Sequence, residues 1–491
     1  MSPRLVLLLC FSACVATAGR PDAGTDLFNY SSTDVLKSVD GPTGAVRVHY
    51  SVSGPNVTLL IDSDGSGVPD FAELVAATAE EVLALFEKAG FERPLSEALV
   101  GLGDLGGSPA FDFYLLDYGG GADGQYASDG CKQGVCAGHM VMENDFKGYG
   151  YSSLKEAVKV LTSHELFHAV QAAYVPNLPV WVSEGTATWA ERLFEPDVAD
   201  FLAFSNAYLA DTGRSLDRPP TGPVPAFAYG TCLFWEFLSQ RHGNAVVRSV
   251  LEASVKNDGV DAVTVALVAS KTTLSEEWLA FVAANLATGT RAGKTAVYPF
   301  AAKLAGVTAT ATGSSLERTD RFYPLAASYY VVEHGGGALG FASDDDATGL
   351  VFSLAPIESG KVGAVLQSWS PTTPALVALG DRPAGNYWLW GTYPEQAANS
   401  RRIHFCVGPP VALAPCAPPV TPEPVVAIAE PDPTTPEPVP PEPQVSAEPV
   451  DSAASNSSGG ACGVGGHGGG LPGLLSVALI AWLRRRRALA A

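Results

Sequence analysis

Two histidines and a glutamate lie in the segment Thr162–Gln171, which reads TSHELFHAVQ. His164 and His168 are four residues apart, so on a helix they project from one face, about one turn from each other. Two imidazole nitrogens so placed can bind one zinc ion, and Glu165, rotated by about 100°, can reach a zinc-bound water without acting as a ligand. The alternative is that both histidines are buried polar residues satisfied by their neighbours.

The helix that must position these residues has clear boundaries in the sequence. Ser153 and Glu156 have the spacing of a capping box, apolar residues then recur with a helical period, and Pro176 prevents continuation. The pattern predicts a helix from about Leu154 to Tyr174.

A catalytic zinc site needs a third protein ligand, which leaves the fourth position to water. The segment LPVWVSEGTATWAERLF follows Pro176, and in it Ser183 is a candidate cap for a second helix with Glu184 in the first turn. The sixteen residues from His168 to Glu184 are enough for the chain to reverse direction. We therefore expect the second helix to return alongside the first.

Four residues after the proline carry a resemblance to a known family: Pro179, Trp181, Glu184 and Gly185. Together with HELFH they resemble the gluzincin metallopeptidases, most closely the peptidase-MA-like group in which P-x-W-x-x-E-G follows H-E-x-x-H. The resemblance implies that Glu184 is the third zinc ligand. It is close over these two segments and looser over residues 30–290, which are similar to exported myxobacterial metallopeptidases.

Two further residues are candidates for supporting roles. Glu191 matches the carboxylate that orients a ligand histidine in aminopeptidase-type gluzincins, although other members carry an acid where this chain has Thr188. The alternative for Glu191 is an exposed helix residue near Arg192. Tyr229, in FAYGTCLFW, is a candidate hydrogen-bond donor to a developing oxyanion, and the alternative is an aromatic packing residue.

These residues predict hydrolysis of peptide bonds in protein or peptide substrates, with endopeptidase action expected. Zinc would lower the pKa of its water, and Glu165 would take the proton and pass it to the leaving amine. Upstream, Met142–Asn144 resembles the end of the G-x-M-E-N segment that holds a substrate's free amine in aminopeptidases, with the glycine displaced. We favour an edge strand here that pairs with a peptide backbone, and Glu143 as amine anchor is the alternative.

A second metal site is indicated by DSDGSGVPDFAE, residues 62–73, which has the ligand spacing of an EF-hand loop. It resembles the strand-loop-helix calcium sites of extracellular bacterial proteins, because a strand is expected before it. A structural calcium ion is the expectation, and a turn that caps the next helix is the alternative. The expected oxygen ligands come from Asp62, Asp64, Ser66, the Val68 carbonyl, Asp70 and Glu73.

Both ends of the chain indicate export. Residues 1–18 have a basic residue, an apolar run and an A-x-A pattern, typical of a secretory signal peptide; lipidation of Cys14 is the alternative. Residues 462–491 combine Cys462, an apolar stretch and four arginines, and resemble the MYXO-CTERM sorting tail of myxobacterial surface proteins. The resemblance implies cleavage near the cysteine, a lipid anchor and outer-surface display, and a permanent membrane anchor is the alternative.

An exported location permits disulfides. Cys131 with Cys136 and Cys406 with Cys416 would each close a short loop, and Cys232 lies in an apolar helical setting that predicts a buried, unpaired thiol.

The order of elements predicts an α+β protein. Residues 19–295 would form a gluzincin-like metallopeptidase domain with a small mixed sheet, the zinc helix and a helical lobe that extends to about Gly289. Strands are expected near residues 47–62, at 110–118 and at 138–146. Residues 300–408 predict an all-β, sandwich-like module, and residues 409–461 a Pro/Glu-rich linker.

The formal charge of -21 argues against nucleic acid as a partner, because nucleic-acid binding rests on basic patches. A different class of function is open: a surface binding or adhesion protein in which the β module binds and the peptidase-like domain is not catalytic. The sequence does not indicate an oligomeric state.

Overall fold

The computed structural model describes residues 19–23, 29–120, 122–218, 226–294, 296–371, 375–395 and 400–417. All of these belong to one compact unit of the chain. The expected signal peptide, most of the expected linker and the sorting tail lie outside the described residues. Within the described ranges, no helix is long and apolar enough to cross a bilayer.

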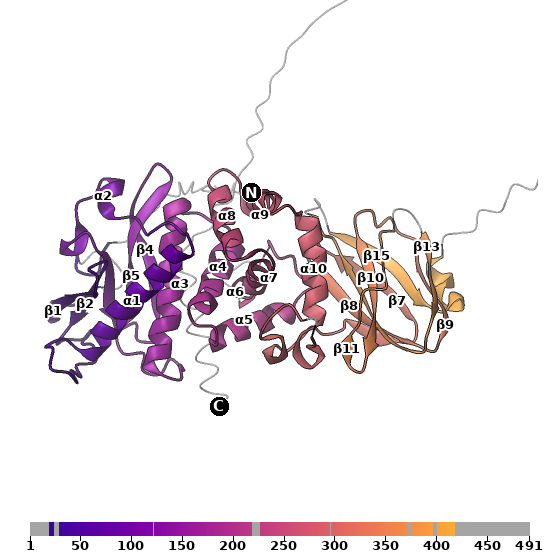
Figure 1. Ribbon diagram of the computed structural model, residues 1–491, viewed down its shortest axis with the longest axis horizontal. Helices are drawn as coiled ribbons and strands as arrows, with labels where there is room; N and C mark the ends of the chain where they lie inside the picture. The colour runs from indigo at the N-terminus through magenta and orange to yellow at the C-terminus, as the bar shows by residue number, and fades with distance from the viewer. Residues whose placement is uncertain are drawn as a thin grey trace, which may run out of the picture. The chain divides into compact units, whose positions relative to one another are not determined.

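A mixed five-stranded sheet forms the N-terminal part (Figure 1). In space its strands follow the order β1-β2-β3-β5-β4. β2, β3 and β5 run parallel, whereas β1 and β4 are antiparallel to their neighbours and lie at the two edges. The strands are β1 (Leu36–Asp40), β2 (Val46–Ser51), β3 (Phe111–Leu116), β4 (Gly124–Lys132) and β5 (Val135–Glu143).

Successive side chains along these strands point to opposite faces, so one face contributes to the main core and the other carries a smaller apolar cluster that includes Tyr114, Leu116 and Val141. Val48, Phe113 and Met140 belong to the main hydrophobic core, which also includes residues of α1 (Asp70–Lys88) and α3 (Leu154–Tyr174). The helices therefore cover the face of the sheet that contributes to the main core.

Helix α3 has the predicted bounds, and Ser153 caps it as predicted, but the Glu156 carboxylate accepts from the Ser152 N–H and not from the Ser153 N–H, so the capping box is only half formed. Ser153 accepts a hydrogen bond from the backbone N–H of Glu156 at 3.1 Å. The second helix, α4 (Val180–Phe194), packs against α3 as expected. The prediction that Ser183 caps it is wrong: Pro179 precedes the first turn, and Ser183 lies inside the helix. The helix therefore begins four residues earlier than a cap at Ser183 would give.

The prediction that the chain is mostly helical to about Gly289 is confirmed. These helices enclose buried aromatic side chains such as Trp235 and Trp278. They are α5 (Ala199–Leu209), α6 (Ala226–Gly230), α7 (Cys232–His242), α8 (Ala245–Ser254), α9 (Gly259–Ala269) and α10 (Leu274–Leu286), and a short α2 (Glu97–Val100) lies earlier in the chain.

The predicted β module is a sandwich of two sheets. One has the order β11-β10-β14-β8-β6, with β12 paired to β10, and the other the order β13-β9-β15-β7. Apolar residues of both sheets meet in a second core. The strands are β6 (Ala311–Gly313), β7 (Leu316–Phe322), β8 (Ala327–His334), β9 (Gly337–Ser343), β10 (Val351–Glu358), β11 (Lys361–Val362), β12 (Gln367–Trp369), β13 (Ala375–Arg382), β14 (Gly385–Thr392) and β15 (Arg401–Gly408). A 3-10 helix, Pro410–Cys416, continues the module past residue 408.

The module and the helical lobe share part of the main core. Trp278 of α10 donates its ring N–H to the Thr392 hydroxyl at 2.7 Å, and the Tyr329 hydroxyl donates to the Val282 carbonyl at 2.8 Å. All four residues are buried. Within the described residues, the helical lobe and the β module therefore pack against each other directly and are not joined only by a linker.

Three strand predictions need correction. The expected strand over residues 57–62 is irregular, with only an isolated bridge from Val57 to Ser51, so the loop that follows is not entered from a strand. β4 lies where no strand is expected from the sequence. Met142 and Glu143 lie on β5, between β3 and β4, so this segment is not an edge strand. The edge is β4, the other half of the same hairpin.

Candidate metal centre

The two helices bring the three predicted zinc ligands together. His164 Nε2 lies 3.4 Å from Glu184 Oε2, and His168 Nε2 lies 3.7 Å from the same oxygen. One ligand atom from each residue falls within 4.8 Å of the other two. The i, i+4 spacing on α3 aligns the imidazoles, and packing of α4 against α3 supplies the carboxylate.

Both histidines are held through their second ring nitrogen. His164 Nδ1 contacts Glu191 Oε1 at 2.8 Å, and His168 Nδ1 contacts Gln171 Oε1 at 2.9 Å. The side-chain amide of Gln171 donates to the Ser183 carbonyl at 2.8 Å, which fixes its orientation. Partners of this kind leave Nε2 for a metal. Glu191 is thus a buried orienting residue, 1% exposed, rather than the exposed helix residue of the alternative.

Gln171 was missed in the sequence. Its position three residues after His168, on the same helix face, is the signal that could have identified it.

The donor set fits zinc. Three ligands about 2.1 Å from one ion in tetrahedral arrangement are about 3.4 Å apart, close to the two distances measured to Glu184. His164 Nε2 is buried and has no hydrogen-bond partner among the described residues. Two nitrogens and one carboxylate oxygen are ligands that zinc accepts, with a fourth position left for water or substrate.

Glu165 lies next to this cluster and is 5% exposed. Its Oε2 accepts a hydrogen bond of 2.8 Å from the backbone N–H of Tyr126 on β4. Burial raises the pKa of Glu165 above its usual range, and the charge of Glu184 adds to the shift, while His164 and His168 oppose it. A carboxylate with a raised pKa is suited to accept and return a proton.

The ligand residues are strongly coupled in charge. Burial disfavours ionisation of Glu184, but the two histidines outweigh it and hold the pKa of this carboxyl well below its usual range. Burial likewise disfavours the charged form of His164, yet the adjacent carboxylates of Glu184 and Glu191 raise its pKa. Two imidazoles around one carboxylate are therefore arranged to bind a cation, either a proton or a metal.

Tyr229 of α6 lies beside the cluster. Its ring centroid is 5.8 Å from that of His164, and the residue is fully buried. Burial raises the pKa of Tyr229 well above its usual value, and the charges of Glu184 and Glu165 raise it further. The hydroxyl therefore keeps its proton and can act as a donor. The ring also stacks on Phe204 at 4.8 Å, so the packing role of the alternative is present as well.

Glu143 does not have the geometry of an amine anchor. It is 2% exposed, and its Oε2 accepts from the Tyr118 backbone N–H at 3.0 Å and from the Tyr149 hydroxyl at 2.7 Å. Burial raises the pKa of Glu143 to about 7. The carboxyl is engaged inside the fold, where it ties β5 to the loops on either side.

The acidic loop of residues 62–73 is exposed over residues 62–67. Asp62 accepts from the backbone N–H groups of Gly65 at 2.8 Å and Gly67 at 2.9 Å, and Asp64 accepts from the Ser66 N–H at 2.9 Å. One oxygen each from Asp62, Asp64 and Asp70 falls within 4.8 Å of the others.

The remaining predicted calcium ligands lie in the same loop. The Ser66 hydroxyl donates to Glu73 Oε1 at 2.9 Å and lies 3.3 Å from the Val68 carbonyl. The loop thus brings oxygen donors together, and the same contacts also serve the turn before α1 that was the alternative reading.

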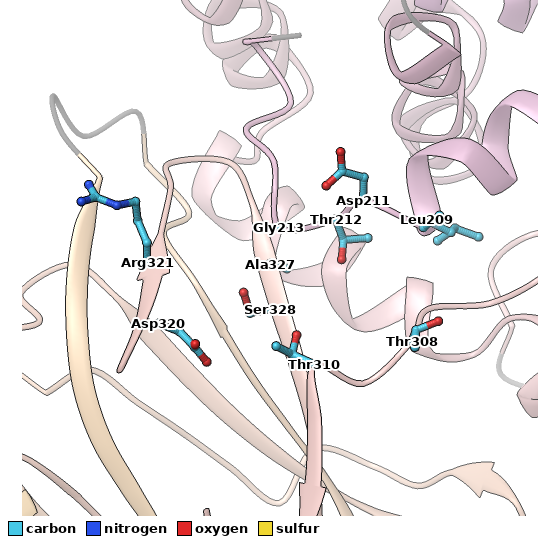
Figure 2. Close-up of a pocket in the computed structure, with 11 residues that line it drawn as sticks. Leu209, Asp211, Thr212, Gly213, Thr308, Thr310, Asp320, Arg321, Ala327 and Ser328 are labelled. Carbon is cyan, nitrogen blue, oxygen red and sulfur yellow. The ribbon is translucent and has the colours of Figure 1, made fainter. Parts of the chain in front are cut away.

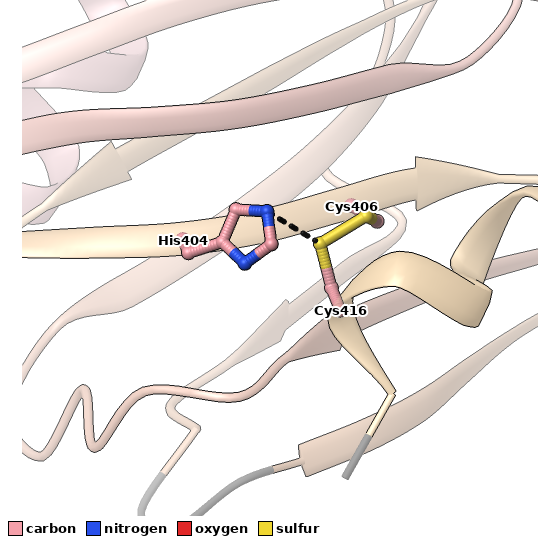
Figure 3. Close-up of side chains that lie close together, drawn as sticks. All are labelled: His404, Cys406 and Cys416. Atoms are coloured by element: carbon pink, nitrogen blue, oxygen red, sulfur yellow. Dashed lines mark hydrogen bonds between the residues drawn. A yellow bond between two sulfur atoms is a disulfide. The ribbon is translucent and has the colours of Figure 1, made fainter. Parts of the chain in front are cut away.

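Another group of metal-ligand residue types lies in the β module. His404 Nε2 is 3.4 Å from Cys416 Sγ, which is bonded to Cys406 Sγ at 2.09 Å (Figure 3). Thiolates are the form of cysteine that binds metal, so sulfurs joined as a disulfide are poor ligands. The cysteine predictions agree with the structure: Cys131 and Cys136 are also joined, at 1.95 Å, and Cys232 is a buried free thiol.

A cavity of about 320 Å³ opens between the end of α5 and strand β8 (Figure 2). Polar residues such as Asp211, Thr310, Asp320 and Ser328 line it. None of the predicted zinc or calcium ligands is among its lining residues, so this cavity is separate from both candidate metal sites.

No protein-family model matches the chain, and no curated protein matches it either.

Proposed function

We propose that this chain is a zinc-dependent peptidase of the gluzincin type that is exported and held at the cell surface through its C-terminal tail. The observation that carries the proposal is the convergence of His164, His168 and Glu184 within 4.8 Å, with Glu165 buried beside them. Burial matters here because exposed clusters of such residues are common on protein surfaces, whereas buried, mutually oriented ones need a ligand or a specific network.

Each residue then has a distinct task. His164, His168 and Glu184 would hold zinc, which when bound supplies Lewis acidity toward water and a carbonyl oxygen. Glu165 accepts a proton at its carboxylate and returns it to the leaving amine. Tyr229 donates its hydroxyl to the oxygen that gains negative charge. Glu191 and Gln171 keep the two imidazoles in the required tautomer and orientation.

The edge strand β4 supports a peptide as substrate. Among the described strands it pairs only with β5, and the Tyr126 N–H on its other side reaches Glu165. An extended peptide that adds to a free strand edge is held by main-chain hydrogen bonds and needs no particular sequence. A substrate paired with β4 would place its backbone beside Glu165.

The deciding experiment uses the purified protein with a diverse peptide mixture, with and without a chelator, and reads cleavage positions by mass spectrometry. We expect cleavage that a chelator stops and zinc restores, with about one zinc per chain by metal analysis. Glu165→Ala should retain the zinc and lose at least about a hundredfold in rate. Glu81→Ala, on the exposed side of α1, is the matched control. An active Glu165→Ala protein would refute the proposal.

We further propose that residues 62–73 bind a structural calcium ion. The support is the set of aspartate oxygens brought together by a loop whose backbone N–H groups already orient them. Hard oxygen ligands from a short loop suit calcium.

A further inference from the structure

The face of the five-stranded sheet away from α1 and α3 carries a buried charged cluster that the proposed reaction does not use. At its centre is Arg20, which is 5% exposed. The side chains around it come from three different elements: Glu97 from α2, Asp112 and Tyr114 from β3, and Asp129 from β4. These long-range contacts hold the segment around Arg20 against the sheet.

The contacts match the shape of a guanidinium group. Arg20 donates through Nε and Nη2 to the two oxygens of Asp129, at 3.1 and 2.7 Å. Nη1 donates to Asp112 and, at 3.1 Å, to the Tyr114 hydroxyl, and Nη2 also donates to Glu97. Bidentate pairing with one carboxylate and single bonds to two others use the flat fork of donors that only arginine has.

The carboxylates around Arg20 are themselves held in place. His139 Nδ1 contacts Asp129 Oδ1 at 2.9 Å, and His49 Nε2 contacts Asp112 Oδ1 at 2.7 Å. Burial works against ionisation of Asp129, but the bonds from His139 and Arg20 lower its pKa overall. The carboxylates are positioned by residues of the sheet and not by Arg20 alone.

The loop before β3 closes the pocket from another side. Gly106 has φ of 67°, and a Cβ added there would lie 2.4 Å from the Asp112 carboxylate oxygens. A glycine is required by both the backbone conformation and the close approach. The pocket is thus shaped by its walls to fit a flat cation.

We propose that the pocket of Glu97, Asp112 and Asp129 is a guanidinium-binding site, that Arg20 is its occupant in the folded protein, and that it accepts a small guanidinium ion from solution when the Arg20 side chain is removed. Three buried carboxylates without a cation repel one another and lose their solvation, which strongly destabilises the fold. A guanidinium ion in the empty pocket reverses this loss. A compact ammonium ion, which lacks the planar fork, does so poorly.

The test is chemical rescue of Arg20→Ala in the full chain, followed by thermal unfolding. The variant should melt about 5 °C or more below the wild type. Millimolar ethylguanidinium chloride should restore most of this difference, and ethylammonium chloride at the same concentration should not. The wild type, whose pocket is filled, should show no increase with either salt.

Two further variants separate the pocket from general effects. Arg93→Ala removes an exposed guanidinium that pairs with Glu87, so its melting temperature should not respond to ethylguanidinium. Asp129→Asn combined with Arg20→Ala removes the bidentate partner and should abolish the rescue.

If Arg20→Ala is not recovered in folded form, the soluble yield after refolding with ethylguanidinium or ethylammonium replaces the melting temperature as the readout. An unchanged melting temperature in Arg20→Ala, no rescue by ethylguanidinium, or equal rescue by ethylammonium would each overturn the proposal. Peptidase activity plays no part in this test, so its outcome is independent of the proposed reaction.

Discussion

At the scale of single residues, the candidate site depends on atoms that do not touch the metal position. Glu191 and Gln171 each engage the Nδ1 atom of one histidine, so each ring presents Nε2 to Glu184. The two partners differ in charge: one is a carboxylate and the other a neutral amide. His168 is therefore the ligand whose orientation rests on neutral partners: the Gln171 amide at 2.9 Å and, more distantly, the Ser183 hydroxyl at 3.4 Å.

Gln171→Leu removes the amide bonded to His168 at nearly constant volume. We expect zinc affinity to fall by about 10- to 100-fold, because the ring of His168 loses its fixed tautomer and orientation. Competition with a chromogenic chelator measures the affinity. Gln240→Leu, on the exposed part of α7, is the control and should leave zinc affinity unchanged. Zinc binding of wild-type strength in Gln171→Leu would contradict the role assigned to this amide.

Glu143 makes a pH-dependent prediction. Burial raises its pKa from 4.5 to about 7, so between these values the folded protein binds more protons here than the unfolded chain. The contribution of Glu143 to the free energy of unfolding is then fully present below about pH 4.5 and is lost as the pH rises to about 7. Glu143→Gln has no charge to bury and should increase the free energy of unfolding at pH 8 by about 1–3 kcal/mol, with little change at pH 4.

Urea unfolding at the two pH values checks the Glu143→Gln prediction, with Glu81→Gln as the exposed control. A variant less stable than the wild type at pH 8 would show that the hydrogen bonds from Tyr118 and Tyr149 require a carboxylate.

At the scale of elements, the loop of residues 62–73 leads directly into α1, which covers the sheet. Its aspartates already accept hydrogen bonds from the loop backbone, so a cation would add charge neutralisation to an existing turn. Stabilisation of α1 through this loop is the expected effect of calcium.

Addition of calcium should release binding heat. At a hundredfold excess over the dissociation constant it should increase the free energy of unfolding by about 2.7 kcal/mol, and the melting temperature should rise accordingly. Asp64→Asn keeps the hydrogen-bonding ability of the side chain but removes one charge, and it should weaken binding at least about tenfold. Asp104→Asn, exposed and outside the loop, is the control. No heat and an unchanged melting temperature would remove the calcium proposal.

The elements also show what the sequence could and could not predict. α3, its cap and the ligand pair His164 and His168 follow from spacing within one helix, which is local information. β4 was missed because its sequence, GQYASDGCK, is polar and Gly-rich, with no apolar alternation. Which strand lies at the edge is decided by tertiary pairing, and this pairing cannot be derived from the residues of one strand. The contacts of Arg20 span up to 109 residues and had no local signal.

At the scale of the whole molecule, the β sandwich shares its core with the helical lobe. Trp278 and Thr392 meet across the junction, and Thr392 also donates to the Ala326 carbonyl at 2.6 Å. This packing gives no separate support to the alternative function, a surface binding or adhesion protein whose β module works independently of the peptidase-like part.

Thr392→Val leaves the Trp278 N–H and the Ala326 carbonyl buried without their partner. We expect a loss of about 1–3 kcal/mol in the free energy of unfolding and a single cooperative transition in calorimetry for both proteins. Thr264→Val, on the exposed side of α9, should change stability little. Two separate transitions, with only one shifted by Thr392→Val, would show that lobe and module unfold independently.

The buried position of Arg20 has a practical consequence for producing the protein. A shortened version that starts at β1 would omit the cation while retaining all three carboxylates, and so would fold poorly even though every helix, strand and metal ligand is present. Recombinant versions should therefore keep the residues from Gly19 onward.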